Sequence, residues 1–487
     1  MRTIVVTSRP GDWPLELEGV EVVLAHDYLT DPAWTRAKRV RVYNLCRSYR
    51  YQSEGYYVSL LATARGHRPF PGLMTVLDTK SRAVVRFVSD DVEELASRSL
   101  AELRAEEFEL SVYFGQNVAK RHARLARRLF QAFPVPLMRA RFRRDDDAWT
   151  LASIATIGTR DVPDAHREFL LTAAAEHFSK ASFRSRANAR RPYSLAILVD
   201  PNEELAPSDP KALDRFERAA EKEGFEVERI GKDDYGRLAE FDALFIRETT
   251  AVAHHTFRFA QRAANEGLVV IDDPESILRC TNKVFQTEAL AQKGVPTPPT
   301  VIVAEVDAAA IERAVGFPCV LKFPDSAFSQ GVIRCDDAAS YAEHAGRALA
   351  QSDLVLVQAY MPSDFDWRIG VFEGEALFAC RYHMARGHWQ IVKTGDGGRH
   401  SYGKVETLPL DEVPPLVVRT ALAAAETIGD GFYGVDLKQF GERVVVTEVN
   451  DNPNVDAGAE DKLLKGELYA RIMAGFRRRV EARKHTR

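Results

Sequence analysis

The rhythm of apolar and polar positions changes near residue 190 and divides the chain into parts. In the first part, short runs of β-branched residues predict strands at Thr3–Val6, Glu21–Leu24 and Val84–Val88. Apolar residues at helical spacing predict amphipathic helices at Asp91–Glu109 and Ala165–Lys180. Because strands and helices alternate irregularly, the sequence predicts a mixed α+β N-terminal domain, residues 1–190.

A basic stretch, Phe183–Arg191, ends at Pro192 and marks a domain boundary, because proline interrupts regular structure. We interpret it as an exposed linker rather than a phosphate-binding patch. Beyond it, strands alternate with helices, and Gly224 and Gly267 follow the helices as C-terminal caps. This alternation predicts a small parallel α/β domain over residues 191–279, without a glycine-rich phosphate turn after its first strand. The expected strands are Ser194–Val199, Phe225–Ile230, Ala243–Ile246 and Leu268–Ile271, and the expected helices are Lys211–Glu223 and His255–Glu266.

The third part, residues 280–480, contains a predicted strand pair that carries polar side chains. Glu448 and Asn450 lie two residues apart on the second strand, so both project from one face. A three-residue loop beginning at Gly441 would place Asp436 opposite Glu448, whereas a two-residue loop would put them on opposite faces. In the first register three oxygen donors converge, which suits Mg²⁺. A hairpin with polar residues on its solvent face is an equally good interpretation of this stretch alone.

Two lysines upstream stand where ligands for a phosphate group are expected. Lys283 opens a predicted helix. Lys322 lies inside the apolar run Pro318–Pro324, where a buried ammonium group needs an anionic partner. A loop of small and hydroxyl residues follows and includes Ser329 and Gly331. Such a loop can bind phosphate through its backbone amides, although alone it is more often an ordinary turn.

The next polar positions suit the rest of a nucleotide. The run Leu354–Pro362 predicts a strand whose edge offers a backbone N–H and C=O to an adenine ring. Asp366 offers a carboxylate for ribose hydroxyl groups, and Arg368 offers a guanidinium for phosphate or carboxylate. Arg381, on the next predicted strand, Ala376–Tyr382, alternates onto a face that could join Arg368.

Composition limits the partners of the protein. The 487 residues carry 66 Lys and Arg against 70 Asp and Glu, a net charge of −4 that argues against a dedicated nucleic-acid binder. The five scattered cysteines form no CxxC pair and offer neither a zinc site nor a disulfide framework. The first apolar run is broken too early for a signal peptide, and no apolar stretch is long enough to span a membrane. We therefore expect a cytoplasmic protein with no nucleic-acid or membrane partner.

Taken in order, these motifs resemble the ATP-grasp superfamily, specifically the RimK-like and glutathione-synthetase-like ligases. The resemblance covers about residues 194–475 and counts the small α/β domain as the one that precedes the ATP-grasp fold. The first 190 residues are extra, and Tyr56–Ala62 through His67 is similar to an N-terminal domain that some RimK-like proteins carry. The motifs that carry the resemblance are Asn282-Lys283, Val320-Leu321-Lys322, the loop to Gly331, Val357–Tyr360, Asp366-Trp367-Arg368, Gly434-Val435-Asp436, and Glu448-Val449-Asn450 with Pro453.

The resemblance implies an ATP-dependent carboxylate–amine ligase that forms an amide bond through an acylphosphate and releases ADP and phosphate. It implies two Mg²⁺ ions, with Mn²⁺ as an alternative, and a small carboxylate and an amine, such as an amino acid or peptide, as substrates. It is compatible with a homodimer. The implied roles are Arg368 and Arg381 as catalytic clamps; Lys283, Lys322, Ser329 and Gly331 around the phosphates; Gln358, Ala359, Tyr360 and Asp366 along the nucleoside; and Asp436, Glu448 and Asn450 at the metal ions.

Two segments depart from the family's pattern. His388–Lys393 replaces an Arg-Ser-Asn-like segment, with Gln390 and Lys393 as candidate substitutes. The loop Asn450–Gly458 is more acidic than the usual ending and suits a cationic or amine substrate. Three other functions compete: amino-acid addition to a protein or peptide C-terminus, an ATP-grasp kinase that stops at phosphorylation, and a nucleotide-binding module without turnover. The last is disfavoured because both lysines and the metal-binding triad are present.

Overall fold

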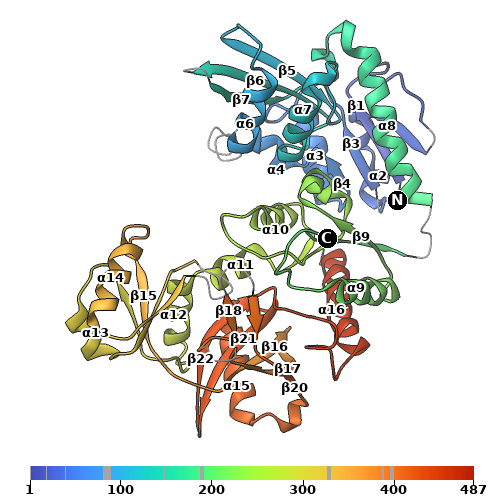
Figure 1. Ribbon diagram of the computed structural model, residues 1–487. Coiled ribbons are helices and arrows are strands. Elements are labelled where there is room, and N and C mark those ends of the chain that lie inside the picture. The colour runs from blue at the N-terminus through green and yellow to red at the C-terminus, as the bar shows by residue number, and fades with distance from the viewer. Residues whose placement is uncertain are drawn as a thin grey trace.

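The structure is a computed structural model that describes residues 2–17, 19–38, 40–80, 89–145, 148–186, 191–325, 331–385, 389–394 and 400–486. The predicted strand Val84–Val88 and the predicted phosphate-binding residue Ser329 lie outside the described residues. Figure 1 shows the N-terminal part at one end, a small sheet in the middle and the C-terminal sheets at the other end.

The N-terminal part contains one parallel and one antiparallel sheet. Its elements are β1 (Arg2–Thr7), β2 (Val20–Leu24), α1 (Ala25–Thr30), α2 (Pro32–Arg36), β3 (Val40–Asn44), α3 (Glu54–Ala64), β4 (Arg68–Phe70), α4 (Leu73–Asp78), α6 (Ser89–Ser99), β5 (Glu107–Tyr113), α7 (Ala123–Ala132), β6 (Leu137–Asp145), β7 (Ala148–Thr156) and α8 (Arg167–Arg186). The parallel sheet has the order β2-β1-β3-β4, and the antiparallel sheet has the order β5-β6-β7. The strands predicted at Thr3–Val6 and Glu21–Leu24 are confirmed as β1 and β2.

The helix predicted over Asp91–Glu109 is too long. α6 ends at Ser99, and the last residues of the predicted helix belong to β5, which begins at Glu107. Phe108 and Leu110 pair with β6 and join the core of this sheet, with Leu110 1% exposed. Strand pairing with residues far along the chain therefore outweighs the local helical pattern.

The helix predicted at Ala165–Lys180 is confirmed as α8, which continues to Arg186. The first residues of the predicted linker Phe183–Arg191 are therefore helical, and residues 187–190 lie outside the described ranges.

The middle sheet is parallel, as the alternation of strands and helices predicted. Its elements are β8 (Tyr193–Leu198), α9 (Pro210–Lys222), β9 (Phe225–Ile230), β10 (Ala243–Ile246), α10 (His255–Asn265), β11 (Val269–Ile271), α11 (Pro274–Thr281) and, from the chain's end, α16 (Gly466–Thr486). The strand order is β11-β10-β8-β9. Gly224 and Gly267 cap the helices at φ +87° and +79°, a left-handed conformation that favours glycine. Figure 1 shows α16 beside α9, where the ring centres of Tyr469 and Phe216 lie 4.6 Å apart.

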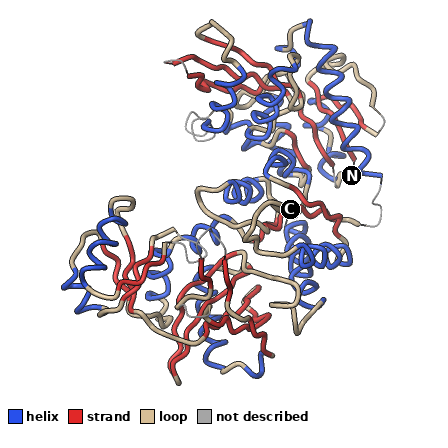
Figure 2. The backbone as a smooth tube through the Cα atoms, in the orientation of Figure 1, coloured by secondary structure: helices blue, strands red, loops and turns tan. Residues whose placement is uncertain are grey.

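Two large antiparallel sheets and a separate two-stranded sheet, β18-β19, form the described C-terminal part. Their elements are α12 (Lys283–Gln292), β12 (Thr300–Val303), α13 (Ala308–Ala314), β13 (Cys319–Lys322), β14 (Val332–Cys335), α14 (Ala338–Leu349), β15 (Val355–Ala359), β16 (Phe365–Phe372), β17 (Glu375–His383), β18 (Val392–Thr394), β19 (His400–Tyr402), β20 (Val405–Leu408), α15 (Pro415–Ile428), β21 (Phe432–Phe440) and β22 (Arg443–Asp451). The first sheet, β12-β15-β13-β14, packs one face on α13 and α14. The second, β20-β17-β16-β21-β22, packs one face on α15. Figure 2 shows the two sheets as separate groups of strands. The predicted α/β and α+β class is confirmed.

Two class-level expectations can be compared with the structure. Among the described residues, no helix combines the length and the apolar character that crossing a membrane requires. The five cysteines are all buried free thiols.

Candidate functional site

One face of the sheet around β16, β21 and β22 collects ionisable side chains. Asp436 lies opposite Glu448, Gly434 lies opposite Asn450, and Arg368 lies opposite Asp436. Residues that oppose one another directly in a ladder project from the same face. The predicted metal-binding residues therefore share one face with Arg368.

The hairpin turn is shorter than the site requires, and a β-bulge corrects the register. The turn is Gly441-Glu442, the two-residue alternative, so Asp436 and Glu448 would lie on opposite faces in a regular ladder. Thr447 is an extra residue that shifts the register by one position. Its hydroxyl donates to the backbone carbonyl of Asp436 at 3.1 Å. The structure therefore has the two-residue loop, and the bulge nevertheless brings the two carboxylates opposite one another.

Arg368 compensates the charge of Asp436 through a bidentate ion pair. Its Nε contacts Oδ1, and its Nη2 lies 2.8 Å from Oδ2. Asn450 Nδ2 donates to the same Oδ2 at 3.1 Å. Burial raises the pKa of Asp436, and the guanidinium opposes that shift. In this structure the predicted phosphate clamp therefore holds a carboxylate.

Glu448 lies beside both predicted phosphate-binding lysines. Lys283 Nζ is 2.6 Å from Glu448 Oε1. Burial would raise the pKa of Glu448, but Lys283 and Lys322 outweigh it and lower the pKa. Burial lowers the pKa of Lys322 to about 8, with Glu448 opposing the shift. Within the described ranges Lys322 has no hydrogen-bond partner, so its ammonium group is available to an added anion.

A small pocket joins the two C-terminal sheets at these residues. It is lined by Lys283 at the start of α12, Lys322 at the end of β13, Gln358 on β15 and Glu448 on β22. Gln358 Nε2 donates to Thr300 Oγ1 at 3.0 Å. Residues far apart in the sequence thus line one pocket.

Of the loop predicted to hold phosphate, residues 326–330 lie outside the described residues, and the residues on either side of them are bonded to one another. Gly331 has φ +72°, and its carbonyl accepts from Phe323 N at 3.0 Å. Lys283 N donates to the carbonyl of Pro324 at 2.9 Å, which ties the start of α12 to the end of β13. That bond places Lys283 next to the residues that end β13.

The strand edge predicted for adenine faces prolines on both sides. Ala359 N donates to the carbonyl of Pro299 at 2.8 Å, and Tyr360 N donates to the carbonyl of Pro318 at 3.3 Å. Proline has no N–H, so neither proline can return a bond to the carbonyl of Ala359 or Tyr360. At these two residues the edge offers carbonyl acceptors, whereas the predicted N–H donors are already engaged.

The divergent segment His388–Lys393 lies next to this edge. The ring centres of Trp389 and Tyr360 are 5.8 Å apart, and Arg334 Cζ lies 4.5 Å from the Tyr360 ring centre. His388 lies outside the described residues. The substrate contacts expected of this segment stay a prediction.

Lys438 is a site residue that the sequence analysis missed. Its Nζ lies 2.5 Å from Asp366 Oδ1 and 2.5 Å from Ser363 Oγ. It stands two positions after Asp436 on β21, so period-two spacing placed it on the same face. The carboxylate predicted at the ribose therefore has a cation beside it.

Arg381 does not join Arg368. It pairs with Trp367, the neighbour of Arg368 on β16, so it projects from the opposite face. Its Cζ lies 4.8 Å from the Trp367 ring centre and 4.9 Å from that of Phe365. The prediction that Arg381 shares the site is wrong, because strand alternation fixes a face only when the register is known.

The acidic loop after Asn450 uses its carboxylates within the protein. Asp451 Oδ2 accepts from Thr250 Oγ1 at 2.6 Å, and Asp456 Oδ1 accepts from Asp209 N at 2.8 Å. These bonds fasten the loop to segments that belong to the middle sheet. The expectation that these acids receive an amine substrate is therefore not supported at either residue.

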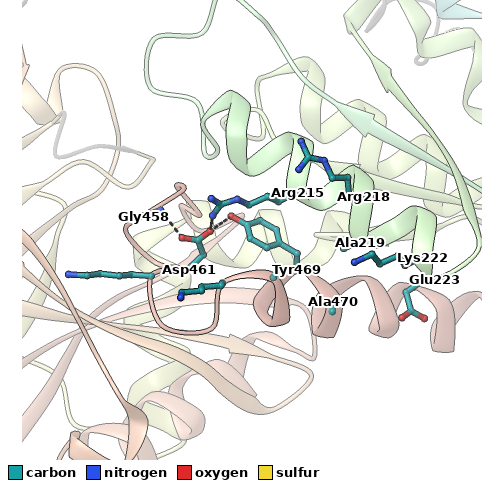
Figure 3. Close-up of a pocket in the computed structure, with 12 residues that line it drawn as sticks. Arg215, Arg218, Ala219, Lys222, Glu223, Gly458, Asp461, Tyr469 and Ala470 are labelled. Atoms are coloured by element: carbon teal, nitrogen blue, oxygen red, sulfur yellow. Dashed lines mark hydrogen bonds and ion pairs between the residues drawn. The ribbon is translucent and has the colours of Figure 1, made fainter.

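A larger pocket lies away from the predicted nucleotide and metal residues. Figure 3 shows this pocket, of about 560 Å³, between α9 and α16, with Asp461 and Tyr469 among its lining residues. Tyr469 donates to Asp461 Oδ2 at 2.8 Å, and Arg215 pairs with the same carboxylate. We place the candidate site at the smaller pocket, because charged groups of complementary chemistry converge there.

Gly434 gives a test of how closely the site is packed. An added β-carbon would lie 2.8 Å from Pro453 Cβ and 3.0 Å from Arg368 Cδ. We expect Gly434→Ala to displace Arg368 and lower ATP turnover by about 100-fold, since small misplacements of positioning groups have effects of this order. Gly346→Ala in α14, where a β-carbon meets nothing within 4 Å, is the matched control. Unchanged turnover in Gly434→Ala, with circular dichroism showing a folded protein, would contradict the expectation.

Comparison with known proteins bears on the family. Residues 280–474 match the RimK-like ATP-grasp domain, and residues 25–173 match the RimK-like ATPgrasp N-terminal domain. The chain belongs to the RimK-like ATP-grasp ligases. The second match accounts for the extra N-terminal part. The two matches and the ligase relatives make the protein an ATP-dependent carboxylate–amine ligase.

Individual relatives of this RimK-like ligase are distant. It is 28% identical over 194 residues to the alpha-aminoadipate–LysW ligase LysX of Saccharolobus solfataricus, covering 38% of this chain and 67% of that protein. It is 24% identical over 223 residues to the probable alpha-L-glutamate ligase 2 of Pseudoalteromonas atlantica, covering 45% and 71%. Among solved structures, D-cycloserine synthetase DcsG has a TM-score of 0.47 at 18% identity and covers 58% of this chain and 99% of its own.

Proposed function

We propose that the ligase activates a substrate carboxylate as an acylphosphate and then joins the acyl group to an amine. The carboxylate oxygen attacks the γ-phosphorus of ATP, and ADP leaves. The amine nitrogen then attacks the acyl carbon, phosphate leaves, and the nitrogen gives up a proton. The observation that carries the proposal is the meeting of Lys283, Lys322 and Glu448 in one pocket between two sheets. Phosphoryl transfer depends mainly on positioning and charge neutralisation, which this arrangement can provide.

The lysines are the proposed phosphate ligands. Lys322 is half-buried and has an ammonium group without a hydrogen bond in the described part of the chain, which favours an incoming anion. Lys283 shares Glu448 with it, and the backbone N–H of Lys283 donates to the carbonyl of Pro324. The carbonyls of Ala359 and Tyr360 are proposed acceptors for the adenine amino group. Their N–H donors being engaged, the donor to adenine must come from another residue.

Two further groups fit the ribose and the metal ion. Asp366 can accept bonds from ribose hydroxyl groups while Lys438 fixes its position at 2.5 Å. Asp436, Glu448 and Asn450 supply hard oxygen donors on one sheet face, the donor chemistry that Mg²⁺ prefers. When bound, the ion would supply further neutralisation of the phosphate charge. Arg368 is the proposed clamp at this end of the site.

The substrates proposed are an amino acid or peptide on the amine side and a small carboxylate on the other. The names of the relatives, an alpha-aminoadipate–LysW ligase and a probable alpha-L-glutamate ligase, support this class. Addition of amino acids to a protein or peptide C-terminus belongs to the same class, and only the products distinguish it.

Product analysis tests the proposal. Purified protein with Mg–ATP is screened against pairs of amino acids and small acids, with phosphate release as the readout and mass spectrometry of the products. ADP and phosphate should form only when both a carboxylate and an amine are present. A stable phosphorylated product without amide would indicate a kinase, and AMP formation would contradict attack at the γ-phosphate.

The pKa of Lys322 predicts how ATP binding depends on pH. Burial lowers this pKa to about 8, and the phosphates of ATP bind the charged form. The affinity for ATP should therefore be highest below pH 8, where Lys322 is charged, and should fall as the pH rises through this value. Arginine stays charged throughout, so Lys322→Arg should reduce the change in ATP dissociation constant between about pH 7 and about pH 9. Calorimetric titration with ATP at fixed Mg²⁺ measures the dissociation constant at each pH. Identical pH profiles for the wild type and Lys322→Arg would refute the role of Lys322.

A further inference from the structure

Three side chains outside the proposed nucleotide site meet at the carboxyl end of β10. Glu248 follows this strand, His254 precedes α10, and His255 is the first residue of that helix. One donor atom of each lies within 4.8 Å of the donor atoms of the others. The two imidazole ring centres are 4.0 Å apart.

Of the two carboxylate oxygens of Glu248, one has a hydrogen-bond partner among the described residues and the other has none. Glu248 is 2% exposed, and its Oε2 lies 2.6 Å from His255 Nε2. Its Oε1 is buried and has no hydrogen-bond partner among the residues the structure describes. Buried polar atoms are nearly always paired, because leaving one unpaired is costly. An additional ligand at Oε1 would remove that cost.

The N-terminal end of α10 lies at this cluster. His254 Nδ1 lies 3.2 Å from the hydroxyl of Thr256, a contact that orients the ring. The same helix end weakens the attraction for a cation, and the carboxylate of Glu248 compensates for this effect.

We propose that Glu248, His254 and His255 bind one divalent transition-metal ion of the Zn²⁺ type. Two imidazoles and one carboxylate are a donor set that suits Zn²⁺, whereas the proposed ATP site offers oxygen donors that suit Mg²⁺. Three protein ligands leave a coordination position for water or a substrate group. The backbone of Glu248 is held in place, because Asn452 Nδ2 donates to its carbonyl at 2.5 Å.

Metal titration of the full-length protein tests this proposal. Protein freed of metal with a chelator is titrated without nucleotide, with Co²⁺ followed by visible absorption and with Zn²⁺ followed by calorimetry. We expect one ion per chain. His255→Ala and Glu248→Gln should each weaken binding by at least about 100-fold, because each loses a direct ligand. His254→Ala, at a more exposed position, gives a variant with little effect on folding.

Two matched variants separate this site from other histidines and from the ATP site. His26→Ala removes an exposed histidine of the N-terminal part and should bind Zn²⁺ as the wild type does. Asp436→Asn alters the proposed Mg²⁺ site and should also leave Zn²⁺ binding unchanged, so the test does not depend on the proposed function. Absence of Co²⁺ and Zn²⁺ binding, or unchanged affinity in both histidine variants of the cluster, would overturn the proposal.

Discussion

Glu448→Ala is expected to lower ATP turnover by about a thousandfold, the order of effect seen when a main electrostatic group of an active site is removed. Glu448 links both halves of the proposed site. Its Oε1 lies 2.6 Å from Lys283 Nζ, and across the sheet it opposes Asp436. Its loss removes the anion shared by Lys283 and Lys322 and one proposed metal ligand at the same time.

The control for this variant is on the same hairpin. Glu442→Ala removes an identical charge from the exposed turn and should leave turnover unchanged. Glu448→Gln keeps the size of the side chain and should be nearly as inactive as Glu448→Ala, because the charge carries the effect. Phosphate release gives turnover, and thermal unfolding shows that each variant is folded. Wild-type turnover in Glu448→Gln would show that the site has been assigned wrongly.

The sequence predicted the residues of this site better than the backbone that arranges them. The chemistry of the site was visible because Glu448 and Asn450 stand two residues apart on one predicted strand and Asp436 stands on its predicted partner. The bulge at Thr447 was not visible, because nothing in the local pattern marks an extra residue in one strand. The sequence left two registers open, and the bulge combines the two-residue turn of one with the carboxylate pairing of the other.

Contacts between charged residues on different strands could not be predicted from the sequence for a similar reason. Lys438 Nζ lies 2.5 Å from Asp366 Oδ1. Along the chain, however, β17 to β20 and α15 separate the strands that carry these two residues. Arg381 was assigned to the site from alternation within its own strand, and the pairing with Trp367 placed it on the other face. The pairing register decides which face of the sheet a side chain projects from, and that register depends on contacts between strands far apart in the sequence.

The middle sheet was predicted more accurately than the N-terminal part. Its strands and helices alternate, and glycines such as Gly224 and Gly267 mark the helix ends, so each local signal agrees with the fold. In the N-terminal part, Phe108 fits the apolar stripe of a helix and also the buried face of β5. Pairing with β6 decided between them.

The second large effect is expected from Arg368. Arg368→Ala should lower the free energy of unfolding by about 3–5 kcal/mol, because it leaves a buried carboxylate without its partner. Nη2 of Arg368 lies 2.8 Å from Asp436 Oδ2, and burial by itself raises the pKa of Asp436. Arg368→Lys keeps a positive charge but cannot form the bidentate pair, so its loss should be smaller.

A double variant and Mg²⁺ together show whether the effect comes from the uncompensated charge. In Arg368→Ala/Asp436→Asn the charge is gone, so the loss should be less than the sum of the single losses. Denaturant unfolding with and without Mg²⁺ measures the coupling between the two substitutions and the stabilisation of each variant by Mg²⁺. Mg²⁺ should restore part of the stability of Arg368→Ala, because a bound cation can replace the guanidinium beside Asp436. It should do less for Asp436→Asn, which has lost the carboxylate. Equal stabilisation of the two variants would contradict a metal ion at Asp436.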